Sequence, residues 1–229
     1  VASLEGGESG QTFSSGMAAI TAVALSLLKK GDQFISTDVV YGCTFGLFSS
    51  ILTRFGIEVS FVDTSDLEAL GEALAKKTRM IFLETPANPT MTVCDIRAIS
   101  ELGREAGAVT VVDNTFASPI NFRPPEIGFD LSLHSCTKYL NGHSDIVAGA
   151  IIGRSGLVEE ITRKLNHLGG SLDPHACFLL HRGMKTLAVR MKHQNESTLK
   201  IARFLDGHEA VARVNYPGLE NHPGHHRAK

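Results

Sequence analysis

The stretch Met80–Asp113 reads MIFLETPANPTMTVCDIRAISELGREAGAVTVVD. It contains two short apolar runs, at 80–83 and 109–112, and both have the length of a buried strand. Between them, Asp95 has the position of an N-cap for a helix that continues to about Ala106. A strand, a helix and a second strand in this order predict two parallel strands joined by a crossover helix.

The same alternation continues on both sides of this unit. We predict further helices at 15–30, 44–54, 66–77, 155–166 and 174–205, and further strands at 33–36, 57–62, 131–133 and 147–152. Continuous apolar strands that alternate with helices are typical of an α/β fold, with a mainly parallel mixed sheet and helices on both faces. We place the end of a large domain near Gly207, so that residues 1–207 form it and residues 208–229 begin a second, smaller domain.

Composition excludes several classes of protein. The chain has 229 residues, a net charge of −2 and 43% hydrophobic residues, which excludes a disordered chain and argues against a nucleic-acid partner. The most apolar stretch, Met17–Leu28, is far shorter than the ~20 residues of a membrane span. Neither a signal peptide nor a transit peptide is visible at Val1, and the two ends read as those of a fragment. Four scattered cysteines predict reduced thiols and a cytoplasmic location.

Polar residues stand where such a sheet binds ligands, at the carboxyl ends of strands and at helix N-termini. Ser15 and Gly16 precede the apolar helix, and Ser15 is either an N-cap or part of a phosphate site. Asp113 ends a buried strand, where it either caps the next turn or binds a positive partner. Lys138 follows the strand at 131–133 and is either a solvated charge or a nucleophilic amine.

Taken together, these residues would suit a ligand with a phosphate, a ring nitrogen and a carbonyl group. Pyridoxal phosphate has all three, and a lysine and an Asp are its usual partners in proteins. The sequence contains neither GxxxxGK[ST] nor a GxGxxG that follows a strand, so the common nucleotide sites are not indicated. The three histidines His222, His225 and His226 lack a fourth ligand at a suitable spacing, and we expect no metal site.

Longer motifs carry a family resemblance over essentially the whole chain. They are Leu4-Glu5-Gly6-Gly7, Ser15-Gly16-Met17-Ala18-Ala19, Tyr41-Gly42-Cys43-Thr44, Glu84-Thr85-Pro86-Ala87-Asn88-Pro89, Val112-Asp113-Asn114-Thr115-Phe116 and Ser135-Cys136-Thr137-Lys138-Tyr139-Leu140-Asn141-Gly142-His143-Ser144-Asp145. With them the sequence resembles the Cys/Met-metabolism family of pyridoxal-phosphate-dependent enzymes, which includes cystathionine γ-lyases, cystathionine γ-synthases and methionine γ-lyases. The resemblance implies the large domain of fold type I.

The resemblance also implies a role for individual residues. Lys138 resembles the lysine that forms a Schiff base with the cofactor, and Asp113 resembles the carboxylate on the pyridine nitrogen, with Thr115 beside it. The expected phosphate ligands are Ser15, Gly16, Met17, Ser135 and Thr137. Tyr41 resembles the aromatic residue whose ring stacks on the cofactor and whose hydroxyl protonates the leaving thiolate. Asn88 resembles the residue that donates a hydrogen bond to the phenolic oxygen of the cofactor. Cys43 resembles an active-site cysteine, and its alternative interpretation is a small buried apolar residue. Glu84 lies in the same segment as Asn88 and receives no role.

The activity implied by the resemblance is that of a carbon–sulfur lyase. We expect γ-elimination from methionine, cystathionine or homocysteine, which yields 2-oxobutanoate, ammonia and a thiol. Two alternatives stay open: γ-replacement on an O-acylated homoserine, and a truncated, non-catalytic module. The family also implies a homotetramer, in which a partner's N-terminal arm and a C-terminal domain supply groups that this chain does not contain. Arg123, Arg182 and Arg190 are interpreted as structural or surface residues.

Overall fold

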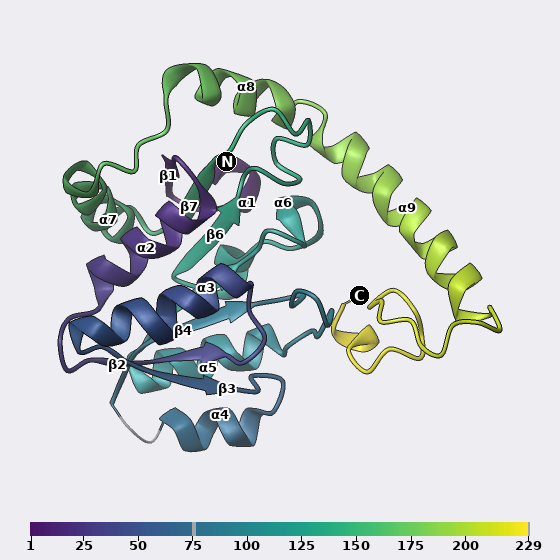
Figure 1. Cartoon of the computed structure of the whole chain (residues 1–229), viewed down its shortest axis with the longest axis horizontal. Coiled ribbons are helices and arrows are strands. Elements are labelled where there is room, and N and C mark those ends of the chain that lie inside the picture. The colour runs from purple at the N-terminus through teal and green to yellow at the C-terminus, as the bar shows by residue number, and fades with distance from the viewer. Residues whose placement is uncertain (75–76, 229) are drawn as a thin grey trace.

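The computed structural model describes residues 1–74 and 77–228, and a mixed sheet forms its centre (Figure 1). Its strands are β1 (Ser9–Phe13), β2 (Gln33–Thr37), β3 (Glu58–Val62), β4 (Thr78–Glu84), β5 (Val109–Asp113), β6 (Leu131–Ser135) and β7 (Gly149–Gly153). They are arranged in the order β1-β7-β6-β5-β4-β2-β3. Neighbours from β6 to β3 are parallel, whereas β7 is antiparallel to both β6 and β1. The predicted mainly parallel mixed sheet is confirmed.

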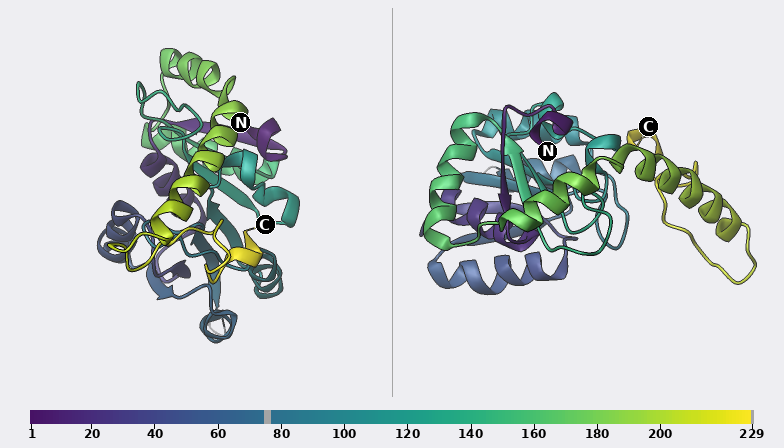
Figure 2. Two further views of the ribbon diagram at one scale, coloured as in Figure 1. Left: turned by 90° about the vertical axis from the view of Figure 1, so that its right-hand side faces the viewer. Right: turned by 90° about the horizontal axis from the view of Figure 1, so that it is seen from above.

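Helices connect the strands and cover both faces of the sheet (Figure 2). They are α1 (Ala2–Glu5), α2 (Gly16–Leu27), α3 (Gly42–Gly46), α4 (Leu67–Leu74), α5 (Ile96–Ala106), α6 (Ser118–Asn121), α7 (Ser155–Leu168), α8 (Pro174–Met184) and α9 (Leu187–Asp206), with the helical turns η1 (Leu47–Ile51), η2 (Leu52–Phe55), η3 (Pro124–Ile127) and η4 (His225–Arg227). The helix predicted over 66–77 corresponds to α4, and residues 75–76 of that prediction lie outside the described residues.

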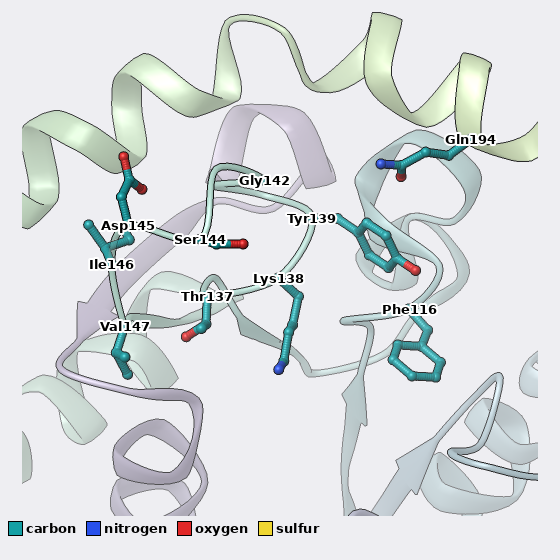
Figure 3. Close-up of a pocket in the computed structure, with 10 residues that line it drawn as sticks. All are labelled: Phe116, Thr137, Lys138, Tyr139, Gly142, Ser144, Asp145, Ile146, Val147 and Gln194. Atoms are coloured by element: carbon teal, nitrogen blue, oxygen red, sulfur yellow. The ribbon is translucent and has the colours of Figure 1, made fainter.

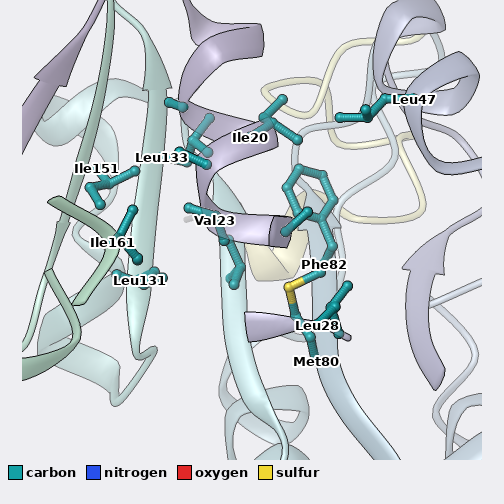
Figure 4. Close-up of a cluster of buried hydrophobic side chains, with 14 of the residues drawn as sticks. Ile20, Val23, Leu28, Leu47, Met80, Phe82, Leu131, Leu133, Ile151 and Ile161 are labelled. Atoms are coloured by element: carbon teal, nitrogen blue, oxygen red, sulfur yellow. The ribbon is translucent and has the colours of Figure 1, made fainter. Parts of the chain in front are cut away.

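Two apolar cores form because successive side chains of a strand point to opposite faces. On β4, Phe82 packs in the core under α2 and α7, while Ile81 packs in the core under α4 and α5. Figure 4 shows Ile20 and Val23 of α2 in the first of these cores, among side chains of the central strands. Strands β4 and β5 contribute apolar side chains to both cores, which explains why their sequences contain continuous apolar runs.

The helix predicted over 174–205 is wrong as a single element, because the chain breaks between α8 and α9. Gly183 packs so tightly on the loop after β6 that a Cβ there would lie 2.3 Å from the carbonyl oxygen of Asn141. Lys185 and Thr186 then turn the chain before α9 begins. A contact with a distant loop accompanies this break, and the local sequence carries no signal for it.

Strand β1 has no counterpart in the sequence prediction. Its sequence, SGQTF, lacks an apolar run, and of its five residues only Phe13 is fully buried. Among the strands of the described residues it pairs with β7 alone, at the edge of the sheet, so one side of its backbone has no neighbour among them. A polar edge strand of this kind gives little periodic signal.

At the other end of the chain, α9 projects away from the sheet and the C-terminal segment runs back towards it (Figures 1 and 2). Among the described residues after Gly207, the helical turn η4 is the regular element. The division into residues 1–207 and 208–229 therefore stays a prediction. In the described ranges, no helix combines the length and the apolar character needed to cross a bilayer.

Candidate functional site

The carboxyl ends of three adjacent parallel strands define the candidate site. β4 ends at Glu84, β5 at Asp113 and β6 at Ser135, so each strand carries a polar residue to the same edge of the sheet. Glu84 and Asp113 are paired in register on neighbouring strands. The N-terminus of α2 meets this edge, as expected for a ligand site in an α/β sheet.

The start of α2 packs tightly against β6 and β7. A Cβ on Gly16 would lie 3.0 Å from the Cβ of Ser135, and a Cβ on Gly149 would lie 2.2 Å from the carbonyl oxygen of Ser15. Ser15 Oγ accepts a hydrogen bond from the backbone N–H of Ala18 at 3.0 Å, so Ser15 is an N-cap. Cap and phosphate ligand are compatible roles, because a helix N-terminus has several N–H groups without a helical partner.

Asp113 is oriented by Thr115. Its Oδ1 accepts hydrogen bonds from Thr115 Oγ1 and from the Thr115 backbone N–H, the second at 3.0 Å. Thr115 Oγ1 also accepts the Ser135 N–H at 2.8 Å, so one hydroxyl joins the ends of β5 and β6. Burial raises the pKa of Asp113, whereas the Thr115 hydrogen bonds and the nearby His134 lower it.

A buried polar pair lies near Asp113 that the sequence analysis does not anticipate. His134 of β6 contacts Glu5 of α1 through Nε2 and Oε1, and both side chains are at most 1% exposed. Asn114 Nδ2 donates to the same Glu5 oxygen at 3.1 Å. The available signal is a histidine inside an otherwise buried strand, which needs a buried partner.

Lys138 follows β6 in a tight turn. Its backbone N–H donates to the carbonyl oxygen of Ser135 at 3.1 Å, and its own carbonyl accepts the Gly142 N–H at 2.7 Å. The side chain borders a cavity of about 670 Å³ together with Thr137 and Phe116, as Figure 3 shows. The other predicted site residues, including Asp113, are not part of the lining of this cavity.

Arg190 of α9 holds the loop that follows Lys138. Its Nη1 donates to the carbonyl oxygen of Tyr139 at 2.8 Å, and its Nη2 donates to that of Gly183 at 3.0 Å. Its Nε donates to Thr186 Oγ1 at 3.0 Å. The interpretation of Arg190 as a structural residue agrees with these contacts, and partial burial lowers its pKa.

Glu84, to which the sequence analysis gives no role, joins two predicted site residues. Its Oε2 accepts the backbone N–H of Tyr41 at 2.8 Å, and its Oε1 accepts that of Asn88 at 3.0 Å. Burial raises the pKa of Glu84 to about 7, and the neighbouring Asp113 carboxylate adds to this rise. Sequence reasoning misses Glu84 because its partners are backbone groups brought together by the fold.

Tyr41 and Cys43 lie at the start of α3, and both are exposed. The Cys43 side chain raises the pKa of the Tyr41 hydroxyl, by a hydrogen bond and by its charge. Because Cys43 is exposed, the alternative interpretation of Cys43 as a small buried apolar residue is wrong. One residue further, Thr44 Oγ1 lies 3.8 Å from the sulfur of Met17, which connects α3 to the start of α2.

Several of the predicted residues, together with Glu84 and Thr44, form a closed circuit of contacts. It runs from Met17 to the start of α3, through Tyr41 and Glu84 to Asp113, and through Thr115 to Ser135, which packs on Gly16. Thr137 is tied to the residue that precedes β7, since its Oγ1 accepts the Ala148 N–H at 3.1 Å. This arrangement offers a helix N-terminus for an anion, a carboxylate for a protonated nitrogen and an amine that can act as a nucleophile.

The C-terminal histidines form other contacts. His222 Nδ1 accepts the Gly224 N–H at 3.0 Å, and His225 Nδ1 lies 2.9 Å from the carbonyl oxygen of Pro217. Within residues 1–74 and 77–228, no group of three His, Cys, Asp or Glu side chains is arranged to hold a metal ion.

Comparison with known proteins relates this site to named enzymes. The chain is 46% identical to a cystathionine gamma-lyase of Bacillus subtilis over 230 residues, and 48% identical to a cystathionine beta-lyase of Lactococcus lactis over 230 residues. It is 43% identical to an L-methionine gamma-lyase of Fusobacterium nucleatum over 232 residues. Each match covers 100% of this chain and 59–60% of the relative, so the chain spans about 60% of the length of these relatives.

Solved structures share the fold. The crystal structure of cystathionine gamma-lyase from Lactobacillus plantarum complexed with L-serine matches with a TM-score of 0.97 and 42% identity, over 99% of this chain and 60% of that one. The family model described as "Cys/Met metabolism PLP-dependent enzyme" matches residues 1–229. The expected α/β fold and the resemblance are thereby confirmed, and the chain belongs to the Cys/Met-metabolism family of pyridoxal-phosphate-dependent enzymes.

Proposed function

We propose that this chain is the cofactor-binding part of a carbon–sulfur lyase that carries out γ-elimination on methionine, cystathionine or homocysteine. The observation that carries the proposal is the circuit of contacts that joins Asp113 to Ser135 and Gly16 at the sheet edge from which Lys138 emerges. Relatives named as gamma-lyases support the reaction type.

The donor set in the structure fits pyridoxal phosphate. Because Gly16 has no side chain, the N-terminus of α2 packs directly against Ser135, which brings the backbone N–H groups there and the Ser135 hydroxyl together as ligands for one phosphate, with Met17 adjoining. Both Thr115 hydrogen bonds reach Oδ1 of Asp113, and we assign Oδ2 to the ring nitrogen. Tyr41 is 48% exposed, which leaves its ring free to stack on a ligand.

When bound, pyridoxal phosphate supplies a carbonyl for an amine and a protonated ring that accepts electrons. The negative charge of Asp113 favours the protonated ring nitrogen. Lys138 Nζ would act as general base first at the α-carbon and then at the β-carbon of the substrate, because loss of a β-proton is what allows the sulfur on the γ-carbon to leave. The Tyr41 hydroxyl, with Cys43 beside it, donates a proton to the departing sulfur. Asn88 binds the phenolic oxygen, and Thr137 and Ser135 complete the phosphate site.

The same proposal covers the organisation of the protein. Residues 1–207 form the cofactor-binding domain, and residues 208–229 begin a smaller domain. The family supports a homotetramer in which a partner subunit completes each site. All four cysteines are free in the structure, which supports a reducing compartment, and we assign the cytoplasm.

The test is product analysis on the full chain supplied with pyridoxal phosphate. With cystathionine as substrate, γ-elimination yields 2-oxobutanoate, cysteine and ammonia, whereas β-elimination yields pyruvate, homocysteine and ammonia. Lys138→Ala is expected to abolish turnover, and Lys185→Ala, a change away from the site, to retain it. Formation of pyruvate instead of 2-oxobutanoate would replace the proposed reaction by β-elimination.

The alternatives are separated by two further measurements. Incubation with an O-acylated homoserine and sulfide tests γ-replacement. If this mixture gives a thiol product and methionine alone gives no 2-oxobutanoate, the reaction is γ-replacement. A chain that binds no pyridoxal phosphate, judged by the absence of a visible absorption band and of borohydride reduction at Lys138, would support the non-catalytic module.

A further inference from the structure

We propose that Glu84 is a positioning residue that fixes Tyr41 and Asn88 at the cofactor site by binding the backbone N–H of each. The two hydrogen bonds measure 2.8 and 3.0 Å and end on different oxygens of one carboxylate. The first spans 43 residues of sequence, so Glu84 ties the segment before α3 to the end of β4. The inference rests on the proposed function in so far as Tyr41 and Asn88 face the cofactor.

The position of the Tyr41 backbone depends on this bond, because few other contacts fix it. The residue is 48% exposed, and it stands at the start of α3 without a side-chain capping bond. Its backbone is fixed on one side by Glu84 and on the other by its carbonyl, which accepts the Phe45 N–H at 3.0 Å. A ring that stacks on a ligand must be placed to within a fraction of an ångström, and here the backbone provides the placement.

Asn88 stands in a similar position on the other side of the carboxylate. The surrounding loop is closed by its own backbone, since Ala87 donates its N–H to Thr92 at 3.0 Å and accepts that of Met91 at 2.7 Å. The bond from Asn88 to Glu84 anchors this loop to the end of β4. One carboxylate therefore sets the relative position of two predicted cofactor contacts.

An ionised carboxylate is the group that this geometry requires. Each of its oxygens accepts a charge-assisted hydrogen bond, and such bonds are stronger than neutral ones. A glutamine has one acceptor oxygen and an NH₂ group that only donates, so it can satisfy one N–H and opposes the other. Glu84→Gln is thus nearly isosteric with Glu84 and still breaks one of the two bonds.

The ionisation of Glu84 is sensitive to its neighbours. Burial and the Asp113 carboxylate on β5 raise its pKa to about 7, while the N–H groups of Tyr41 and Asn88 lower it. On the other side of β4, strand β2 brings Ser36 and Thr37 to this region, which carry no charge. The two N–H bonds form a clamp that favours the ionised carboxylate, so the clamp is expected to weaken as Glu84 is protonated below about pH 7, although burial makes the folded state as a whole favour the protonated form.

The experiment compares Glu84→Gln and Glu84→Asp with wild type, and Glu101→Gln on the exposed surface of α5 is the matched control. The first readout is hydrogen exchange of the Tyr41 and Asn88 amides in the full chain without cofactor, expressed as protection factors at pH 6 and pH 8. In wild type we expect higher protection at pH 8. In Glu84→Gln we expect one amide to lose about tenfold in protection at pH 8, and the pH dependence to disappear.

The second readout is the dissociation constant of pyridoxal phosphate, which we expect Glu84→Gln to raise about tenfold and Glu101→Gln to leave unchanged. Unaltered protection in both Glu84 variants would overturn the clamp. Lost protection with unaltered cofactor affinity would reduce Glu84 to a structural residue and overturn its positioning role. If wild type binds no cofactor, the proposed function and the positioning role both fall, while the exchange data still decide whether the clamp exists.

Discussion

Arg190 lies directly against Gly142, and a Cβ on Gly142 would come within 2.1 Å of Nη1 of Arg190. The backbone of Gly142 has φ +74°, a conformation that side chains other than glycine rarely adopt. The guanidinium can reach the carbonyl of Tyr139 because nothing fills the space at Gly142. Helix α9 is in this way fastened to the loop that carries Lys138.

Arg190→Lys is expected to loosen this loop. A lysine has no planar fork and cannot reach the carbonyls of Tyr139 and Gly183 and the Thr186 hydroxyl together. We expect a loss of about 2 kcal/mol in the free energy of unfolding, measured with urea, and slower reaction of Lys138 with pyridoxal phosphate. Arg182→Lys on the exposed side of α8 is the control, and equal effects of the two substitutions would refute a special role of Arg190.

Thr115→Val is expected to weaken cofactor binding through Asp113. The substitution removes the hydroxyl that donates to Asp113 and accepts the Ser135 N–H, so the pKa of Asp113 rises further above its usual value. We expect the dissociation constant of pyridoxal phosphate to increase about tenfold, or about 1.4 kcal/mol, in a fluorescence titration. Thr115→Ser keeps the hydroxyl and should retain the wild-type affinity. A weak Thr115→Ser variant would show that the methyl group, and not the hydroxyl, matters.

Two glycine substitutions are expected to act in opposite directions. Gly149→Ala places a Cβ 2.2 Å from the carbonyl of Ser15, so the start of α2 must move, and we expect a loss of about 3 kcal/mol in stability. Gly71→Ala on α4 meets open space in a helix and should stabilise the chain by about 0.5–1 kcal/mol. Urea unfolding of both variants measures the difference. A neutral Gly149→Ala would mean that the close approach of β7 and α2 is not required.

The raised pKa of Glu84 has a consequence for stability. The pKa of Glu84 is about 7 in the folded chain, against the ordinary glutamate pKa of 4.5 in the unfolded chain, so the folded state binds more protons between these two pH values. The contribution of Glu84 to stability therefore decreases as the pH rises from about 4.5 to 7, by up to about 3 kcal/mol. The pKa of Asp113 is also raised, so the contribution of Glu84 must be isolated by comparing wild type with a Glu84 variant.

Urea unfolding of wild type and Glu84→Gln at pH 5, 6, 7 and 8 isolates this contribution. We expect the free energy of unfolding of wild type to fall relative to the variant as the pH increases, and to level off above pH 8. A constant difference between the two proteins across this range would show that the pKa of Glu84 is not raised.

The sequence predicted the central architecture because burial on both faces turns strands into apolar runs. Strands β4 and β5 each differ from the prediction by at most two residues at an end. The predicted helix at 44–54 is one continuous helical segment in the structure, but it starts at Gly42 and continues as η1 and η2. Changes of helix type inside a segment depend on packing and leave no clear local pattern.

The candidate site was predictable where chemistry coincides with position in the sequence. Asp113 and Lys138 follow strands, so their types and places are visible in the chain. Glu84, His134 and Arg190 were not assigned to the site, because each acts through groups distant in sequence: backbone N–H groups, a buried carboxylate and loop carbonyls. Long-range contacts of this kind follow only from the folded arrangement.

The pairing of β1 with β7 has a consequence for the order in which the molecule is completed. Ser9 is opposite Gly153 and Phe13 is opposite Gly149, so the strand nearest the N-terminus has its partner some 140 residues later in the chain. During synthesis, β1 is made long before β7 and cannot pair with it until β7 has left the ribosome. Because β1 is polar, it is less prone to aggregate before β7 has been made than an unpaired apolar strand would be.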